Sequence, residues 1–417
     1  MEFSRRGRQL LPVMIVALLV AVALAPTVSG AASHRARPAQ AGPFDTRGLW
    51  IWELGSSDHG NVSSIIARAH RYKITTLYIK SGDGTNTWSQ FNSSLVSNLH
   101  ANGLRVCAWQ YVYGSYPLRE AQVGATAVHD GADCLAIDAE AEYEGKYWQA
   151  QRYVTRLRQL IGSSFPVALA GLPYVDYHPS FPYSVFLGPN GAQYNVPQMY
   201  WRDIGTTVDQ VFAHTYTYNR PYQRPIYPLG QVYNAPTRAQ IMRFRRLGIA
   251  YGATGVSWWD WQEAASYSWG AIANWLPAST SAQAVTVMPT LRKGAAGDLV
   301  VWAQEHLRSA GETVTVDGGF GKQTLSAVES FQLAHGLTAD GVIGTATWTA
   351  LLSYQPASVT WSKPSKKKTT RLGGRLTGAA VAAADNGGAS PTLSAPVSAL
   401  LPDRGNELAG SPGAGRP

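Results

Sequence analysis

Residues 47–275 alternate between short apolar segments that predict strands and longer amphipathic segments that predict helices. The strand segments are residues 48–53, 75–80, 104–111, 134–140, 166–170, 196–200, 225–229 and 255–259. The helical segments are residues 62–72, 88–102, 118–130, 147–161, 208–218, 238–247 and 267–275. Only the connection after the fifth strand, rich in Pro and Tyr, lacks a helical pattern. Eight such units in about 230 residues predict an α/β fold, a (β/α)8 barrel of the TIM type over residues 45–276.

Polar side chains gather where the predicted strands end. In a (β/α)8 barrel the carboxyl ends of the strands meet at one face, and that face carries the active site. The residues concerned are Glu53, Lys80, Gln110, Asp138, Glu140, Gln198, Tyr200, Asp260 and Gln262. This convergence favours a catalytic face over scattered surface polarity.

The fourth predicted strand carries the most informative of these patterns. Its apolar residues are followed by Asp138, Glu140 and Glu142, which alternate with period two. Alternate residues of a strand share a face and lie about 6.5–7 Å apart along the backbone, so each charge opposes ionisation of the next. Acids at the end of an apolar strand indicate chemistry or ligand binding. A solvated acidic loop is the alternative.

The first 32 residues have the three parts of an export signal. Arg5, Arg6 and Arg8 precede an apolar run over residues 10–25, and small residues at 28–32 offer a cleavage site. A retained membrane anchor is the alternative, but the apolar run is short for a membrane span. We therefore expect a secreted or cell-wall-associated protein with no stable membrane anchor after signal removal.

The chain has two cysteines, Cys107 and Cys134, in neighbouring predicted strands. An exported protein meets oxidising conditions, so a disulfide is one possibility and two buried free thiols are the other. Neither cysteine has the spacing of a zinc site. His59, His178 and His214 are isolated in the sequence, so we expect neither a metal nor another cofactor.

The net charge of +9 is concentrated near the ends of the chain. Residues 1–32 hold three Arg and one Glu, and residues 353–417 hold eight basic and three acidic residues. A net charge of about +2 remains for the region between them. The basicity is therefore no indication that the folded region binds nucleic acid.

The part of the chain after the predicted barrel divides into three. Residues 277–289 are a Ser/Thr/Ala-rich linker, residues 290–352 a small unit, and residues 353–417 a basic low-complexity tail that we expect to be disordered. The small unit contains a repeat, in which Asp317-Gly and Asp340-Gly are offset by 23 residues. Each Asp-Gly pair predicts a tight turn that leads into a helix.

The small unit resembles the type 1 peptidoglycan-binding domain of bacterial cell-wall hydrolases, a three-helix module. The matching segments are residues 291–294, 301–304, 317–321, 327–332, 336–344, 347–348 and 351–352. Trp302 departs from the pattern, because that helix position is usually not aromatic. The resemblance implies a small all-α domain whose partner is peptidoglycan or a related amino-sugar polymer. The basic tail would add attraction to anionic wall polymers.

The barrel region resembles family 25 glycoside hydrolases, which are muramidases. Tyr78-Ile-Lys80-Ser-Gly-Asp-Gly84 is similar to their second-strand signature, and Asp138-Ala-Glu140 is similar to their fourth-strand Asp-x-Glu. These enzymes also carry an acid on the first strand, where this chain has Trp50.

Family 18 chitinases offer a second resemblance. Their fourth strand reads Asp-Gly-x-Asp-x-Asp-x-Glu, which Asp133, Asp138 and Glu140 match, with Ala136 in place of the middle Asp. The segments at residues 198–201 and 256–259 resemble elements of their sixth and eighth strands. Both families cleave β-1,4 links beside an N-acetylated sugar, so the resemblance implies the substrate class more closely than the family.

These resemblances imply roles for individual residues. Glu140 would be the acid that protonates the leaving oxygen, Asp138 would orient the 2-acetamido group that attacks the anomeric carbon, and Tyr200 would support that group. The remaining residues expected to contact substrate are Trp50, Trp52, Lys80, Gln198, Trp258 and Asp260. The alternative for Lys80 is that it only neutralises the acids.

Three functions stay open at this point. The first is an active glycoside hydrolase that acts on cell-wall amino sugars. The second is a non-catalytic peptidoglycan-binding protein with a degenerate barrel, which the missing first-strand acid favours. The third is another enzyme class, such as an amidase, for which the sequence shows neither zinc ligands nor a nucleophile.

Overall fold

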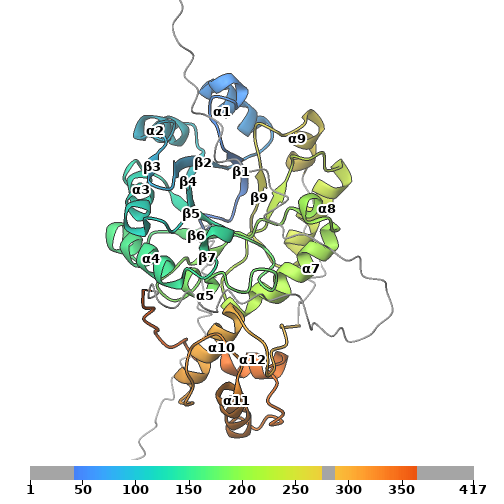
Figure 1. The fold of residues 1–417 in the computed structure, drawn as a ribbon. Coiled ribbons are helices and arrows are strands. Elements are labelled where there is room, and N and C mark those ends of the chain that lie inside the picture. The colour runs from blue at the N-terminus through green and yellow to red at the C-terminus, as the bar shows by residue number, and fades with distance from the viewer. Residues whose placement is uncertain (1–41, 275–286, 364–417) are drawn as a thin grey trace, which may run out of the picture. The chain divides into compact units, whose positions relative to one another are not determined.

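The computed structural model describes residues 42–274 and 287–363 (Figure 1). The predicted signal peptide, most of the predicted linker and the tail beyond residue 363 lie outside the described residues. Within the two described ranges, no helix has the length and apolar character needed to cross a membrane.

Eight parallel strands form the barrel, in the order β7-β6-β5-β4-β2-β1-β9-β8. They are β1 (Arg47–Ile51), β2 (Thr76–Asp83), β4 (Arg105–Val112), β5 (Cys134–Ala139), β6 (Val167–Gly171), β7 (Tyr194–Asn195), β8 (Leu229–Gln231) and β9 (Val256–Trp259). Parallel bridges from Asn195 to Ile226 and from Gln198 to Leu229 join the two ends of this order. The sheet is therefore closed as expected for an α/β barrel. The short β3 (Asn86–Thr87) adds an antiparallel pairing to β2.

Helices surround the sheet (Figure 1). They are α1 (Val62–Arg71), α2 (Ser93–Ala101), α3 (Pro117–His129), α4 (Tyr147–Ile161), α5 (Tyr183–Phe186), α6 (Trp201–Ile204), α7 (Val208–Asn219), α8 (Arg238–Ala250) and α9 (Ser266–Ala273), with short 3-10 turns η1 (Asp58–Gly60), η2 (Ala141–Tyr143) and η3 (Arg220–Tyr222). α7 and α8 begin with capping boxes, in which Thr207 and Thr237 bond the backbone of the Gln three residues later. The connection after the fifth strand of the chain holds only the one-turn α5, consistent with the absence of a helical pattern there.

Two strands are displaced from the predicted segments. β7 (Tyr194–Asn195) ends just before the sixth predicted strand, residues 196–200, and β8 (Leu229–Gln231) overlaps the seventh, residues 225–229, only at Leu229. Pro197, Pro225 and Pro228 lie in these segments. Because proline has no N–H to donate, it shortens the hydrogen-bonded ladder without changing the direction of the chain.

The strands separate two apolar layers. Residues that point outward pack beneath the helices, and residues that point inward fill the lumen. In the lumen the ring of Trp50 stacks on Tyr78 with centroids 4.8 Å apart, and the Trp50 Nε1 donates to Ser257 Oγ at 3.0 Å. The barrel interior is thus a packed core beneath its carboxyl-end face.

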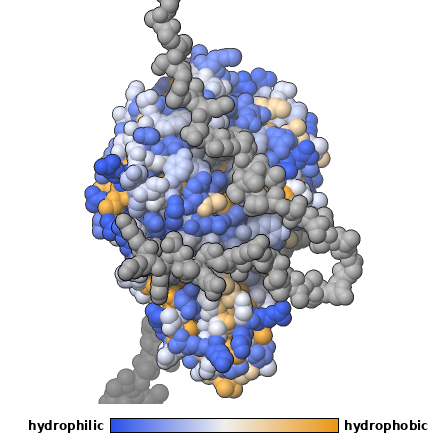
Figure 2. Space-filling view, viewed as in Figure 1, coloured by the Kyte–Doolittle hydropathy of each residue, from blue (hydrophilic) through white to orange (hydrophobic). Residues whose placement is uncertain are grey.

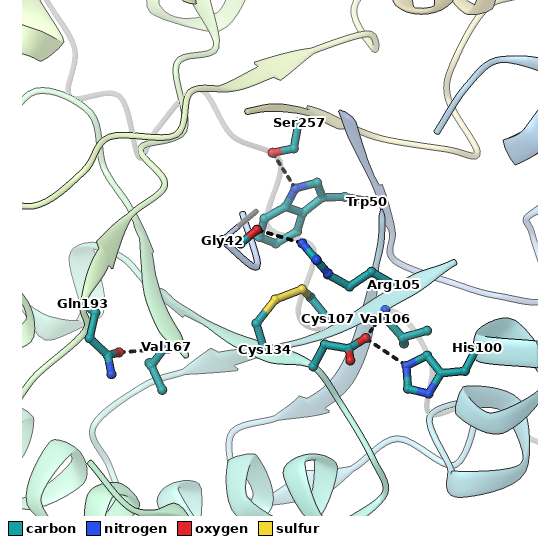
Figure 3. The surroundings of a disulfide bond; sticks show 11 residues. Gly42, Trp50, His100, Arg105, Val106, Cys107, Cys134, Val167, Gln193 and Ser257 are labelled. Atoms are coloured by element: carbon teal, nitrogen blue, oxygen red, sulfur yellow. Dashed lines mark hydrogen bonds and ion pairs between the residues drawn. A yellow bond between two sulfur atoms is a disulfide. The ribbon is translucent and has the colours of Figure 1, made fainter. Parts of the chain in front are cut away.

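The two cysteines lie side by side on the neighbouring strands β4 and β5, and both point into the lumen. Cys107 pairs with Cys134 in the register of the two strands, and their sulfur atoms form a disulfide (Figure 3). Of the two possibilities left open by the sequence, the structure has the bonded pair.

The small domain consists of α10 (Asp298–Ser309), α11 (Lys322–Ala334) and α12 (Thr345–Leu351). The buried Gln304 donates from Nε2 to Asp317 Oδ1 and Thr324 Oγ1, each at 3.0 Å. Its Oε1 accepts from the Asp317 N–H at 3.0 Å. Gln332 makes the same kind of contact to Asp340 in the second repeat. The repeated residues therefore hold the turns between the helices.

Residues 353–363, called the return segment below, lie against α4 of the barrel. The ring of Trp361 is 4.3 Å from that of Tyr147. Gln151 donates to Val359 O at 2.6 Å and accepts from the Trp361 N–H at 2.9 Å. The prediction of disorder from residue 353 is therefore wrong for this segment, because its partners are some 200 positions away and composition does not reveal them.

On the face drawn in Figure 2, the described surface is mostly hydrophilic, and apolar residues form small separate patches. Among the described residues, Leu333 on α11 is the most exposed large apolar side chain, at 70%. Single exposed apolar residues are ordinary in soluble domains and indicate no site.

Candidate active site

A single amide joins the two central carboxyl groups. Asp138 lies near the end of β5 and is buried, whereas Glu140 follows the strand and is partly exposed. Gln198 follows β7 and forms a parallel bridge with Leu229 of β8. Its Nε2 donates to Asp138 Oδ1 and to Glu140 Oε1, both at 2.9 Å. The structure thus brings together three of the predicted residues at the carboxyl ends of the strands.

The surroundings of Asp138 disfavour its charged form. Burial raises the pKa of Asp138 well above its ordinary value, the neighbouring Glu140 charge raises it further, and Lys80 acts in the opposite direction. Two carboxyls that share one donor in a poorly solvated place titrate as a pair. Asp138 therefore keeps its proton to higher pH than an isolated carboxyl would.

Tyr200 and Asp260 complete the cluster. Burial is the main cause that raises the pKa of the Tyr200 phenol well above its ordinary value, with further contributions from Tyr233, Asp138, Glu140 and Asp260. Tyr200 is therefore a neutral hydroxyl at physiological pH. Asp260 is fully buried at the end of β9, and its Oδ1 accepts from the Glu263 N–H at 3.2 Å.

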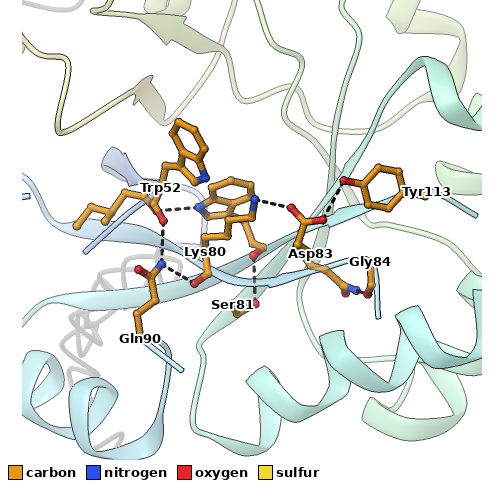
Figure 4. A network of polar contacts seen from close by, with 10 residues as sticks. Trp52, Lys80, Ser81, Asp83, Gly84, Gln90 and Tyr113 are labelled. Atoms are coloured by element: carbon orange, nitrogen blue, oxygen red, sulfur yellow. Dashed lines mark hydrogen bonds and ion pairs between the residues drawn. The ribbon is translucent and has the colours of Figure 1, made fainter. Parts of the chain in front are cut away.

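Lys80 lies in an enclosure of aromatic rings and one acid (Figure 4). Its Nζ is 2.7 Å from Asp83 Oδ2, and the Lys80 side chain is 7% exposed. The rings of Trp88, Trp109 and Trp52 have centroids 4.3, 5.0 and 5.9 Å from the Nζ. Because the ammonium group is already paired and covered, its position favours neutralising the nearby acids over contacting a sugar.

Trp50 and Trp52, two of the tryptophans expected to contact substrate, differ in their exposure. Trp52 is partly exposed and borders Lys80, so it lies at the face. Trp50 lies deeper in the lumen beneath Tyr78 and Trp109, with 1% exposure. A sugar cannot reach Trp50 in this conformation.

Trp258 lies on the other side of its strand from the site. It is fully buried, and its ring is 5.0 Å from that of Phe244 on α8. Ser257 and Trp259 face the lumen instead, since Ser257 bonds Trp50 and the ring of Trp259 is 5.2 Å from that of Trp109. The structure therefore does not place Trp258 with the site, and strand alternation counted from Ser257 would have selected Trp259.

Glu142 does not share a strand face with the other two acids, contrary to the period-two expectation. β5 ends at Ala139, and Glu142 lies in η2, where it is exposed and accepts from Tyr111 OH at 2.8 Å. The prediction was wrong because a 3-10 turn replaces the last strand residues.

Tyr111, Tyr233 and Asp83 are site residues that the sequence analysis did not single out. Tyr111 pairs with Asp138 in the register of β4 and β5. The Tyr233 ring meets that of Tyr200 edge-on at 5.5 Å, and its hydroxyl donates to Asp203. Inward alternation from Cys107 through Trp109 was the available signal for Tyr111.

Within the described ranges, no group of three or more His, Cys, Asp or Glu side chains is arranged to hold a metal ion. His178 and His214 each pair with one carboxylate, Glu144 at 2.8 Å and Asp176 at 2.6 Å.

Comparison with known families identifies the small domain. Residues 296–351 match the family model described as "Putative peptidoglycan binding domain". These residues are a peptidoglycan-binding domain. The match covers the three helices and both Asp-Gly turns, in agreement with the resemblance seen in the sequence.

Individual relatives share only part of the chain. The zinc D-Ala-D-Ala carboxypeptidase of Streptomyces albus G is 32% identical over 98 residues, which are 22% of this chain and 38% of that protein. A peptidoglycan-binding protein from Clostridioides difficile, solved with glutamine hydroxamate, is 48% identical over 15% of this chain and 40% of its own, with a TM-score of 0.15. The chain thus spans less than half the length of either protein.

A second similar structure is a class V chitinase from Pseudomonas fluorescens Pf-5. It is 10% identical, covers 54% of this chain and 98% of its own, and has a TM-score of 0.42.

Proposed function

We propose that this protein is an exported cell-wall hydrolase that cleaves β-1,4 glycosidic bonds next to N-acetylated amino sugars. The peptidoglycan-binding domain supports the wall as its place of action. The observation that carries the hydrolase proposal is the Gln198 amide that joins Asp138 and Glu140 beside Tyr200. Glycoside hydrolysis uses two neighbouring carboxyls in different surroundings, and here the pKa of the buried Asp138 is raised beside the more exposed Glu140.

In the proposed reaction Glu140 is the general acid, because it is the more exposed of the two carboxyls. It gives its proton to the leaving glycosidic oxygen while the substrate's acetamido oxygen bonds to the anomeric carbon. Asp138 accepts the acetamido N–H, and the neutral Tyr200 hydroxyl donates to the acetamido oxygen. A water oxygen then bonds to the anomeric carbon as the bond from that carbon to the acetamido oxygen breaks, which restores the acetamido group. The water gives one proton to the Glu140 carboxylate, so the general acid is regenerated.

A non-catalytic wall-binding protein is the second candidate function, and one observation favours it. Trp50 occupies the first-strand position where the muramidases that the barrel resembles carry an acid, and it is packed on Tyr78 with no route to a substrate. In this case the small domain would bind peptidoglycan and the barrel would only contact it.

The decisive experiment compares residues 33–417 with a Glu140→Gln variant. Each is incubated with peptidoglycan and with chitin oligomers, and new reducing ends are measured by mass. We expect the variant to lose at least about a hundredfold in rate, the usual scale for a general acid, and to sediment with peptidoglycan as before. Asp209→Asn, which changes an exposed carboxyl on α7, is the matched control. Equal rates for Glu140→Gln and the parent would remove Glu140 from this role, and no new ends with any variant would favour the binding protein.

A further inference from the structure

A buried carboxylate on α10 is bonded to the barrel. The Asp298 N–H donates to Pro179 O at 2.7 Å. Asp298 Oδ2 accepts from the Ser184 N–H and from Tyr222 OH, both at 2.8 Å, and Oδ1 accepts from the Ser184 hydroxyl at 2.7 Å. Asp298 has no exposed surface. A buried carboxyl is retained only where such donors satisfy it, so this contact depends on matched partners from α5 and η3.

Trp302, one turn further along α10, makes a second contact. Its Nε1 donates to Pro221 O at 2.7 Å, and its ring lies 5.5 Å from that of Tyr222. Trp302 is the residue that departs from the type 1 pattern, in which this helix position is usually not aromatic. An aromatic residue there is explained by the barrel surface that it meets.

The return segment makes a third contact that does not involve α10 side chains. The ring of Trp361 lies against that of Tyr147, and Gln151 bonds the Val359 carbonyl and the Trp361 N–H. The Ala357 N–H donates to Glu305 O at 3.1 Å. The return segment therefore runs from α12 past α10 to α4 of the barrel. The chain that follows the small domain thus contacts the barrel as well.

We infer that the peptidoglycan-binding domain of this chain is docked on its own barrel through α10 and the return segment, as a fixed pair rather than as a freely tethered module. Two buried polar contacts and two tryptophans hold the pair. The face of α10 that carries Asp298 and Trp302 is consequently unavailable to the wall polymer. Peptidoglycan must contact the domain elsewhere. This inference is independent of whether the barrel is catalytic.

The test is to cut the linker and ask whether the halves stay together. A protease site is placed within residues 277–289 of the full chain, the linker is cleaved, and the fragments are analysed by gel filtration and by capture through a tag on the barrel. We expect the fragments to elute as one complex. Trp302→Ala and Asp298→Ala should each weaken the complex at least about tenfold, since each removes a buried hydrogen bond and its packing.

Three further variants keep the outcome interpretable. Asp298→Asn retains oxygen and nitrogen atoms that can satisfy the same partners, so it should preserve the complex. Leu333→Ser changes an exposed residue of α11 and should also leave it intact. Ser184→Ala removes the hydroxyl from the barrel side, which covers the case in which an α10 variant fails to fold. Separation of the parent fragments after cleavage would overturn the inference, and so would a complex that survives Trp302→Ala, Asp298→Ala and Ser184→Ala alike.

Discussion

The small domain and the barrel use their recognisable residues in opposite ways. In the small domain the repeated Gln and Asp residues bond one another, with Gln304 and Gln332 each holding an Asp-Gly turn. In the barrel Asp138 and Glu140 are held at the carboxyl-end face by one shared donor. The many matching residues of the small domain therefore indicate its fold and family. The few matching residues of the barrel indicate only the position of a site. Substitutions in the barrel site should therefore lower the hydrolysis rate, whereas substitutions in the small domain should lower its stability.

The largest expected effect is on catalysis at the barrel. Asp138→Ala removes the proposed partner of the acetamido N–H and should lower the hydrolysis rate by about a hundredfold or more, with sedimentation on peptidoglycan unchanged. The rate is measured from new reducing ends, as for Glu140→Gln. Asp209→Ala, an exposed carboxyl on α7, should leave the rate unaltered. A full rate with Asp138→Ala would mean that the site is not catalytic in the way proposed.

The next effect is on the folding of the small domain. Gln304→Leu leaves the Asp317 and Gly318 N–H groups without their acceptor, which costs about 1–3 kcal/mol for each buried group. Denaturant unfolding followed by tryptophan fluorescence should show the loss, with the barrel transition retained. Gln323→Leu, the same chemical change at an exposed position of α11, should cost far less. Equal losses for both variants would show that the Gln304 contacts do not hold the turn.

A third effect is a gain of stability at the site. The pKa of Asp138 is raised above its ordinary value of 3.8 in the folded protein, so folding favours the protonated form. Its contribution to stability is present below about pH 3.8 and is lost as pH rises through the folded pKa. Asp138→Asn cannot ionise and should therefore raise the melting temperature at pH 8 while changing it little near pH 4.

Asp209 should show the opposite pH dependence of the melting temperature. Arg243 lowers the pKa of Asp209 below its ordinary value, so its contribution is present at neutral pH and is lost on acidification. Asp209→Asn should slightly lower the melting temperature at pH 8, where Asp138→Asn raises it. A lower melting temperature for Asp138→Asn at pH 8 would contradict the assignment of an unfavourable buried charge.

The smallest expected effect concerns the basic run beyond the return segment. Lys366, Lys367, Lys368, Arg371 and Arg375 have no acidic residue among them. Deleting residues 364–417 should weaken retention on whole walls at low salt and change little near 0.5 M salt, where screening shortens the range of the attraction to about 4 Å. Identical low-salt retention of both proteins would leave the wall contact to the small domain alone.

The architecture of the barrel was predictable because hydrophobic periodicity is a local property. Its eight alternations survive in the structure even where Pro197 and Pro228 shorten a ladder. The face was predictable for the same reason, since Asp138 lies near the end of a strand and Gln198 and Asp260 each follow one. Two predictions about side-chain direction were wrong. Trp258 points to the opposite face of its strand from the one expected, and Glu142 lies in a 3-10 turn instead of a strand.

Contacts between distant parts of the chain were not predictable. Nothing near Trp302 or Trp361 in the sequence specifies Pro221 or Tyr147 as a partner. Likewise the enclosure of Lys80 combines rings from three separate segments with Asp83. Such arrangements follow from closure of the barrel, which brings together residues that no local pattern relates.

The disulfide gives the molecule a dependence on where it matures. Cys107 and Cys134 lie four residues before Tyr111 and Asp138 on the same two strands, about 13 Å below the acid along the strand direction. Protein produced in a reducing compartment would carry two thiols at this place. Two preparations of identical sequence can therefore differ in how firmly the strand that bears Asp138 is held to its neighbour. The redox conditions under which the protein was produced should therefore be controlled in any measurement of its activity.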